Sequence, residues 1–166
     1  FGYGFNATTL QLAQAYSVFA NGGVFRPVTL LKSEKIEQGE RVLSENTAQR
    51  INRMLAQVVV DDGTAPLAQI PNYHVAGKTG TVKKAVAGGY AEKRYLSIFT
   101  GFAPLKQPRL AMAVVINEPS KGDYYGGKVA APVFSIVIGG ALRILNIPPD
   151  NLQLRQANVS KERNSV

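Results

Sequence analysis

The sequence predicts an α/β fold in which helices pack against a short antiparallel sheet. Three observations support this: two segments near the N-terminus with helical spacing of apolar residues, three strand-like segments between residues 74 and 117, and an apolar helical run after them. Hydrophobic residues make up 45% of the 166 residues and charged residues 18%, which is typical of a globular chain. The predicted order is therefore helix, helix, three strands, helix.

The first helix follows a glycine-rich segment over residues 1–6. Thr8 and Gln11 have the spacing of a capping box, in which each side chain accepts a hydrogen bond from the other residue's backbone N–H. Apolar side chains then recur at helical spacing, at Leu12, Ala15, Tyr16 and Phe19. We expect the helix to end at Asn21-Gly22-Gly23, because these residues tolerate a positive φ.

Residues 24–43 predict a small extended excursion, in which Val28–Leu31 pairs with Arg41–Leu43 around Gln38-Gly39. Ser44 or Asn46 then caps a second helix, which stops near residues 61–63. The apolar face of this helix comprises Ile51, Met54, Leu55, Val58 and Val59.

From His74 the apolar pattern changes to that of strands. We predict a first strand over His74–Thr81 or a little beyond, a loop over residues 83–94 rich in lysine, glycine and tyrosine, and a second strand over Tyr95–Ala103. A third strand follows over Arg109–Asn117. Short connections make the three strands an antiparallel meander. Both faces of the third strand are apolar, so helices should cover both faces of the sheet.

The last helix is predicted from Val129 to about Leu145 and is apolar almost all round. Its longest uncharged apolar run has about 14 residues, which is shorter than a membrane span requires. Pro148-Pro149 stops the helix. We therefore expect a folded unit over residues 1–147 and a polar, disordered tail over residues 148–166. The sequence begins with Phe1 rather than methionine and shows no signal peptide, so we expect it to be a piece of a longer protein.

Composition excludes several kinds of site. There is no cysteine and a single histidine, His74, so we expect no metal, no cofactor and no Ser-His-Asp triad. His74 is interpreted as a half-buried strand residue. The net charge of +8 favours anionic partners. The basic residues are scattered, however, and no basic–aromatic RNA motif or arginine-striped helix is present, so nucleic acid is not expected.

The segment Lys78-Thr79-Gly80-Thr81 carries the candidate chemistry. In a strand, Lys78 and Gly80 share one face, and Thr79 and Thr81 share the other. Gly77 and Gly80 lack a Cβ, so a ligand can approach the backbone. We predict an edge strand that offers N–H groups, hydroxyls and a positive charge to an extended anionic ligand by strand addition. Taken alone, the four residues are more typical of a polar strand end entering a turn than of a binding site.

The flanking motifs resemble those of class B penicillin-binding proteins. Residues 2–13 and 20–23 are similar to the region upstream of that family's third active-site motif, and residues 75–81 match the Lys-Thr-Gly motif itself. Residues 124–134, beginning Tyr124-Tyr125-Gly126-Gly127, resemble the family's entry into its last helix. The three motifs occur in the family's order over residues 1–146. The likeness is to FtsI-type septal D,D-transpeptidases of Gram-negative bacteria, and it implies the penicillin-binding/serine β-lactamase-like fold.

The resemblance implies the following roles. In the family, a serine of a Ser-x-x-Lys motif attacks a D-alanine carbonyl of a peptidoglycan stem peptide, and the acyl group passes to the amine of a neighbouring stem. Lys78 would draw in the substrate carboxylate and tune proton transfer, and the Thr81 backbone N–H would be half of an oxyanion hole. The hydroxyls of Thr79 and Thr81 would bind the terminal carboxylate of the stem peptide or of a β-lactam, on the strand that also contains Gly80.

Four flanking residues are further candidates for substrate binding. Lys83 is a second anion contact or an ordinary exposed lysine. Tyr95, Tyr124 and Tyr125 resemble aromatic positions that line one wall of the β-lactam site, and the alternative is tyrosines at strand and helix ends.

No serine in these 166 residues has a lysine three positions later. Ser44-Glu45-Asn46 formally matches the family's second motif, Ser-x-Asn, and we interpret it as a helix cap. We therefore expect residues 1–147 to be the C-terminal half of a transpeptidase domain that is inactive in acyl transfer on its own. The parent protein would lie at the periplasmic face of the inner membrane, held by an anchor outside this sequence. Its partners would be peptidoglycan stem peptides, β-lactams and divisome membrane proteins.

Two other interpretations remain open. Serine β-lactamases and β-lactam sensor domains also carry Lys-Thr-Gly, although the segment entering the last helix argues against both. A noncatalytic penicillin-fold binding module is the third possibility, in which the strand binds stem peptide, glycan or divisome partners without chemistry.

Overall fold

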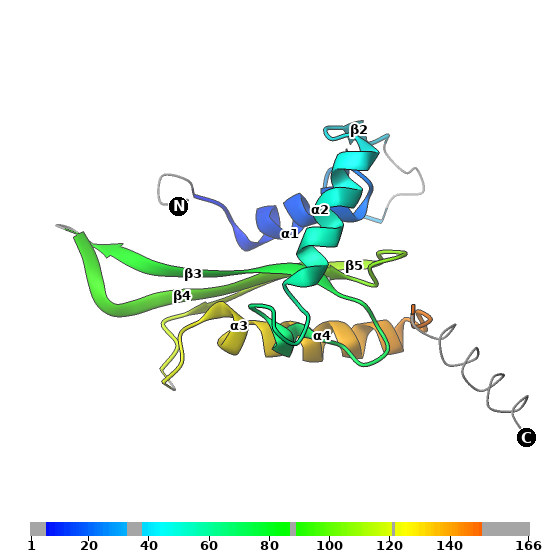
Figure 1. The fold of residues 1–166 in the computed structure, drawn as a ribbon. Helices are drawn as coiled ribbons and strands as arrows, with labels where there is room; N and C mark the ends of the chain where they lie inside the picture. The colour runs from blue at the N-terminus through cyan, green and yellow to red at the C-terminus, as the bar shows by residue number, and fades with distance from the viewer. Residues whose placement is uncertain (1–5, 33–37, 87–88, 121, 151–166) are drawn as a thin grey trace, which may run out of the picture.

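A three-stranded antiparallel sheet lies between two layers of helices (Figure 1). The computed structural model describes residues 6–32, 38–86, 89–120 and 122–150. One face of the sheet is covered by α1 (Thr9–Ala20) and α2 (Glu45–Gln57), and the other by α3 (Gly126–Val129) and α4 (Ala131–Ile144). The predicted α/β class and the helical cover on both faces of the sheet are confirmed.

The sheet is the predicted meander, in the order β3-β4-β5. Its strands are β3 (Ala76–Val86), β4 (Gly89–Ala103) and β5 (Leu110–Asn117). Both pairings are antiparallel, with Ala76 opposite Phe102 and Phe102 opposite Ala111. Because β3 pairs only with β4 in the described part of the chain, one of its edges is open, as predicted for an edge strand.

The predicted loop over residues 83–94 is wrong. Here β3 runs on to Val86 and β4 already starts at Gly89, so the two strands form a long hairpin that extends beyond the helices (Figure 1). The first strand also starts at Ala76, two residues after His74. His74 therefore lies outside the strand, which corrects its interpretation as a strand residue, and half of its side chain is exposed.

Both predicted helix starts are confirmed. The Thr8 backbone N–H donates to Gln11 Oε1 (2.8 Å) and the Gln11 N–H to Thr8 Oγ1 (3.2 Å), which completes the capping box. Ser44 Oγ accepts from the Thr47 N–H (3.1 Å), so Ser44-Glu45-Asn46 is a helix cap, as we interpreted it. On α2, however, the side chain of Met54 is largely exposed and does not belong to the buried face.

The excursion before α2 pairs different residues from those predicted. The two short strands are β1 (Val24–Phe25) and β2 (Glu40–Arg41), with Val24 opposite Arg41. Thr29 Oγ1 bonds both the N–H and the carbonyl of Leu31, a local turn that competes with strand pairing. The part of the predicted turn before Gln38 lies outside the described residues.

The last helical region is divided into α3 and α4 at Ala130. Pro132 occupies the first turn of α4, where its missing N–H is tolerated, and it could not serve in the middle of one continuous helix. The helical region also begins at Gly126, three residues before the predicted start. Within the described ranges, no helix is long and apolar enough to cross a bilayer.

The main core lies between the sheet and α4. Phe99 of β4 and Phe134 of α4 are fully buried and meet edge to face, with ring centroids 4.9 Å apart. Burial of one such side chain contributes about 1.5–3 kcal/mol. The core extends along α4 through Ile138 and Leu142, so α4 and the sheet are held as one body.

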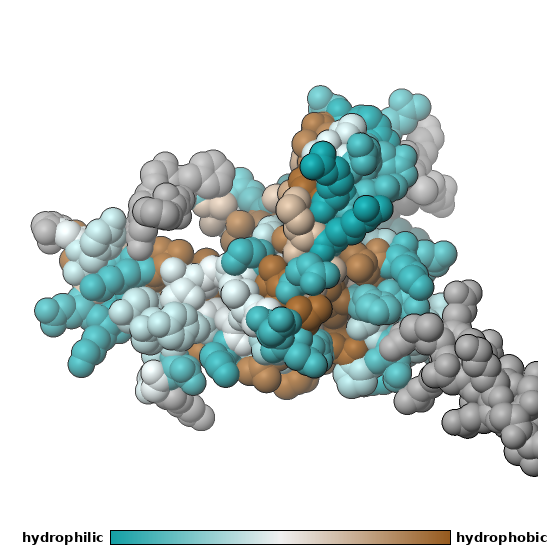
Figure 2. Space-filling view, in the orientation of Figure 1, coloured by the Kyte–Doolittle hydropathy of each residue, from teal (hydrophilic) through white to brown (hydrophobic). Residues whose placement is uncertain are grey.

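One side of α4 remains uncovered. Along the lower edge of the molecule, where Figure 1 places α4, Figure 2 shows brown, hydrophobic residues at the surface. Val133, Ile136, Val137 and Ile144 of α4 are all exposed, with Ile136 at 74% and Ile144 at 81%.

After α4, Asp150 folds back and accepts a hydrogen bond from the His74 N–H (2.8 Å). Residues 151–166 of the predicted tail lie outside the described residues.

Candidate active site

The Lys-Thr-Gly-Thr segment lies on β3 at the open edge of the sheet. The side chain of Lys78 starts on the face opposite to that of Thr79, as strand alternation requires. Its ammonium nevertheless lies 3.2 Å from Thr79 Oγ1 and 3.2 Å from the Thr79 carbonyl O. Only an edge strand leaves room for a side chain to reach around in this way. The structure therefore brings a cation to the threonine face.

Thr79 and Thr81 face α3. Directly opposite them on β4 are Phe99 and Ser97, respectively. Thr81 Oγ1 accepts a hydrogen bond from the Gly126 N–H at the start of α3 (3.0 Å). A hydroxyl has one proton to donate and two lone pairs to accept with. Because the Gly126 N–H occupies one lone pair, the Thr81 proton is available for an acceptor outside the strand.

Two glycines allow α3 to start directly on the sheet. A Cβ at Gly126 would lie 2.2 Å from the Ile98 carbonyl O and 2.6 Å from the Gly80 carbonyl O. A Cβ at Gly127 would lie 2.1 Å from the carbonyl O of Thr64. We expected a ligand to approach the strand backbone at Gly80, and part of that space is instead occupied by the start of α3. At Gly77 the space is filled by the ring of Phe99, 2.5 Å from a Cβ placed there, so no ligand enters at that position.

The three predicted tyrosines form one aromatic stack, the tyrosine stack (Tyr95, Tyr124 and Tyr125). The rings of Tyr95 and Tyr124 are stacked with centroids 4.1 Å apart and planes 12° from parallel. The Tyr124 hydroxyl donates to that of Tyr125 (3.2 Å), and this hydrogen bond is the main cause of a raised pKa at Tyr124. Ser97 Oγ donates to the Tyr124 carbonyl (2.5 Å), which attaches the stack to β4 beside Thr81.

Lys83 lies directly opposite Tyr95 across the β3–β4 pairing. Paired residues share a face of the sheet, so Lys83 lies on the face of Thr81 and of the tyrosine stack. It is half-buried rather than freely exposed. All eight predicted site residues thus come from two neighbouring strands and the segment entering α3.

Two residues that support this site were not predicted from the sequence. Thr64, between α2 and β3, places its Oγ1 3.4 Å from Thr79 Oγ1, and nothing in its local sequence indicates this. Ser97 is fully buried and lies between two apolar residues of β4, Leu96 and Ile98. A polar residue flanked by apolar residues in a strand indicates a buried hydrogen bond, so Ser97 could have been identified.

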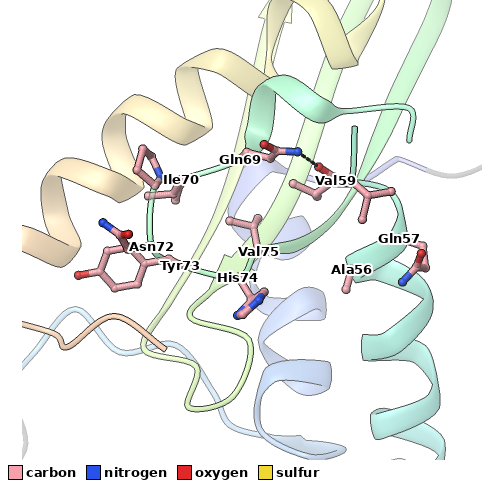
Figure 3. Close-up of a pocket in the computed structure, with 11 residues that line it drawn as sticks. Ala56, Gln57, Val59, Gln69, Ile70, Asn72, Tyr73, His74 and Val75 are labelled. Atoms are coloured by element: carbon pink, nitrogen blue, oxygen red, sulfur yellow. Dashed lines mark hydrogen bonds between the residues drawn. The ribbon is translucent and has the colours of Figure 1, made fainter. Parts of the chain in front are cut away.

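A separate hollow lies just before the N-terminal end of β3 (Figure 3). It has a volume of about 610 Å³ and lies between the C-terminal end of α2 and the segment leading into β3. Val59, Ile70 and Val75 give it an apolar lining, and the Gln69 amide donates to the Val59 carbonyl across it (2.9 Å). None of the predicted site residues lines this hollow. In the ranges that the structure describes, no cluster of three or more His, Cys, Asp or Glu side chains could hold a metal ion.

The edge strand can therefore bind an anion from one side. One ammonium and two hydroxyls whose protons can point outward converge near Thr79 and Thr81, on a strand with one open edge in the described part of the chain. Charge-assisted hydrogen bonds of this kind are roughly twice as strong as neutral ones.

The chain belongs to the penicillin-binding protein transpeptidase family. The family described as "Penicillin binding protein transpeptidase domain" matches residues 1–139. The solved structure of the transpeptidase domain of Burkholderia pseudomallei penicillin-binding protein 3 superposes with a TM-score of 0.83 at 43% sequence identity, and covers 89% of this chain and 45% of that one. The family and fold expected from the three motifs are confirmed.

Curated relatives are D,D-transpeptidases by name. The probable peptidoglycan D,D-transpeptidase PbpC of Pseudomonas aeruginosa is 48% identical over 153 residues. Peptidoglycan D,D-transpeptidase FtsI of Escherichia coli is 42% identical over 158 residues. The matches cover 92% and 95% of this chain, respectively, and 27% of each relative. The chain thus spans about a quarter of the length of these relatives.

Proposed function

We propose that this chain forms the carboxylate-binding side of the active site in a peptidoglycan D,D-transpeptidase. The observation that carries the proposal is the convergence of Lys78, Thr79 and Thr81 on the α3 side of an open-edged strand. The names of the relatives support D,D-transpeptidation as the reaction. The family match over residues 1–139 includes Lys78-Thr79-Gly80-Thr81 and supports its assignment as the family's Lys-Thr-Gly motif.

In this proposal, the terminal carboxylate of a stem peptide or a β-lactam accepts hydrogen bonds from the hydroxyls of Thr79 and Thr81. The Gly126 N–H donates to Thr81 Oγ1 and the Lys78 ammonium to Thr79 Oγ1, so each hydroxyl can direct its own proton to the carboxylate. Lys78 adds a positive charge beside the same carboxylate. The Thr81 backbone N–H, on the open strand, serves as one donor to the tetrahedral oxyanion.

The tyrosine stack and Lys83 form the neighbouring wall of the site. Stacked rings offer a flat apolar surface to a ligand side chain, and Lys83 offers a second cation on the same face. Gly80, between the two threonines, brings the strand backbone close to the ligand. We assign these residues to substrate binding rather than to proton transfer.

The nucleophile comes, in this proposal, from a part of the transpeptidase domain outside these 166 residues. Residues 1–147 then form the C-terminal half of that domain, which agrees with coverage of 45% of the solved transpeptidase structure. The exposed apolar residues of α4 also agree with it, since a half domain leaves exposed the surface that its other half covers. Acyl transfer needs both halves, so the chain alone is inactive.

The biological setting is inferred from the FtsI relative. We propose that the whole protein is anchored in the inner membrane, faces the periplasm and cross-links stem peptides during septum formation. Membrane proteins of the divisome are its partners, and β-lactams are its inhibitors.

The test is fluorescent-penicillin labelling of the full-length gene product. We expect covalent labelling of the whole protein and none of the 166-residue chain. Lys78→Ala should slow labelling by about ten- to a hundredfold, the effect of losing a charge-assisted interaction with the carboxylate. Lys32→Ala, which removes an exposed lysine far from β3 in the sequence, is the matched control and should label at the normal rate. A full-length protein that no β-lactam labels would contradict the proposal.

A further inference from the structure

The hairpin of β3 and β4 contains a bulge next to the proposed site. Pairing is regular down to Lys83 opposite Tyr95, and the next pair is Ala85 opposite Tyr90. Two steps along β3 therefore match five along β4, which leaves three extra residues in β4. We call residues 91–94 the β4 bulge. It ends immediately before Tyr95, the first ring of the tyrosine stack.

The β4 bulge has a conformation that the chain does not favour by itself. Lys93 has a φ of +55°, in the left-handed region that suits glycine. A residue with a Cβ in this region costs roughly 1–2 kcal/mol. Such a conformation persists only where surrounding contacts determine it. The contacts that hold the bulge are therefore candidates for a role in the site.

Those contacts converge on Glu118, which follows β5. Glu118 Oε1 lies 2.6 Å from Arg94 Nη2, on the bulge, and 2.5 Å from Lys84 Nζ, on β3 opposite the bulge. The backbone N–H of Glu118 donates to the carbonyl of Tyr95 (2.8 Å). We call Glu118, Arg94 and Lys84 the Glu118 cluster. One residue thus holds the bulge, the opposite strand and the backbone of the first stacked tyrosine.

The Glu118 side chain stays negatively charged near neutral pH. Hydrogen bonds from Arg94 and Lys84 lower its pKa from 4.5 to about 2. The carboxylate therefore stays ionised and keeps both cations at any pH near neutrality. Beyond the bulge, a hollow of about 400 Å³ lies beside the stack, lined by Lys93, Tyr95 and Tyr124 together with Pro119 and Gly122.

We propose that Glu118 is a positioning residue that fixes Tyr95 against Tyr124 and so sets the preference of the site for ligand side chains. This inference rests on the proposed function, because it assigns the tyrosine stack to ligand binding. Glu118 touches no reacting group. Its loss should therefore weaken contacts with a ligand's side chain and leave the carboxylate contacts of Thr79 and Thr81 unchanged.

The experiment compares two β-lactams on the full-length protein. Benzylpenicillin carries an aromatic side chain, and 6-aminopenicillanic acid carries none. We expect Glu118→Gln to lower the second-order acylation rate constant for benzylpenicillin roughly three- to tenfold, the range of one aromatic contact. The rate constant for 6-aminopenicillanic acid should change by less than about twofold. A purely structural role would lower both rates together.

The control and the alternative variant come from the same bulge. Glu92→Gln makes the same change of charge at an exposed residue and should leave the ratio of the two rates unaltered. If Glu118→Gln does not fold, Arg94→Gln removes one of the two cations and should shift the ratio in the same direction. Equal loss for both β-lactams, or an unchanged ratio, overturns the inference. A wild-type protein that neither β-lactam acylates overturns the proposed function itself, and this inference with it.

Discussion

Replacement of Gly126 by alanine tests how closely α3 is joined to the active-site strand. A Cβ at this position would lie 2.2 Å from the Ile98 carbonyl O and 2.6 Å from the Gly80 carbonyl O. Both oxygens belong to strand backbone, which cannot rotate aside as a side chain can. To restore 3.0 Å, below which Cβ contacts essentially never occur, the start of α3 must move by about 0.8 Å.

That displacement acts directly on Thr81. The Gly126 N–H, 3.0 Å from Thr81 Oγ1, is the donor that leaves the hydroxyl proton available for a carboxylate. A misplacement of about 1 Å can cost about 10²-fold in rate, and overpacking destabilises a fold by about 1–3 kcal/mol. We therefore expect Gly126→Ala to lower the rate of penicillin acylation of the full-length protein by about a hundredfold. Its free energy of unfolding should fall by about 1–3 kcal/mol.

The assay is stopped-flow acylation with fluorescent penicillin, combined with urea unfolding. Lys32→Ala, at an exposed residue far from β3 in the sequence, is the control. It should leave both the acylation rate and the urea midpoint of unfolding unchanged. If Gly126→Ala acylates at the wild-type rate and unfolds at the wild-type urea concentration, α3 is not joined to β3 in this way, and the reasoning is refuted.

Substitutions at three residues, Thr81, Phe134 and Glu118, give separate predictions. Thr81→Val should slow acylation by about ten- to a hundredfold, because a hydrogen bond to a charged group is lost. Thr81→Ser keeps the hydroxyl and should restore most of the rate. Equal rates for the two variants would contradict the assigned role. Phe134→Ala should lower the free energy of unfolding by about 3–5 kcal/mol in urea titrations, and a loss below 1 kcal/mol would show that the ring of Phe99 is not held by it. The folded-state pKa of Glu118 is depressed from 4.5 to about 2, so its contribution to stability is present above pH 4.5 and is lost as the pH falls toward 2. The difference in melting temperature between wild type and Glu118→Gln should therefore be constant near neutrality and vanish at acid pH.

The elements that follow from local chemistry could be predicted from the sequence. The capping box at Thr8 and the cap at Ser44 each depend on residues three positions apart, and both occur as expected. The antiparallel meander follows from short connections between apolar segments. The family followed from three ordered motifs, which the match over residues 1–139 confirms.

The long hairpin could not be predicted, because its stability depends on distant residues. Lysine, glycine and tyrosine between residues 83 and 94 are typical of a loop. Besides their own backbone pairing, these strands are joined by ion pairs to a carboxylate at Glu118, 34 positions after Lys84. Similarly, Thr29 and Leu31 form a local turn in place of the predicted strand pairing, since one side chain satisfies both backbone groups.

The candidate site was predicted as a set of residues but not as an arrangement. The alternation of Lys78 and Thr79 placed them on opposite faces, and only the open edge of β3 lets the ammonium return to the threonine side. The tyrosine stack joins β4 to the segment before α3, and the hydrogen bond from the buried Ser97 that fixes it crosses 27 positions. The roles of Lys78, Thr79, Gly80, Thr81, Lys83, Tyr95, Tyr124 and Tyr125 stay predictions.

The most direct test of the central claim is a crystal structure of the full-length protein acylated by benzylpenicillin. We predict that the ligand carboxylate lies within about 2.5–3.0 Å of both Thr79 Oγ1 and Thr81 Oγ1, with the ester carbonyl O about 2.7–3.2 Å from the Thr81 backbone N. The serine that carries the acyl group would come from outside this chain. An acylated protein whose ligand carboxylate contacts neither threonine would contradict the assignment of β3 as the carboxylate-binding strand.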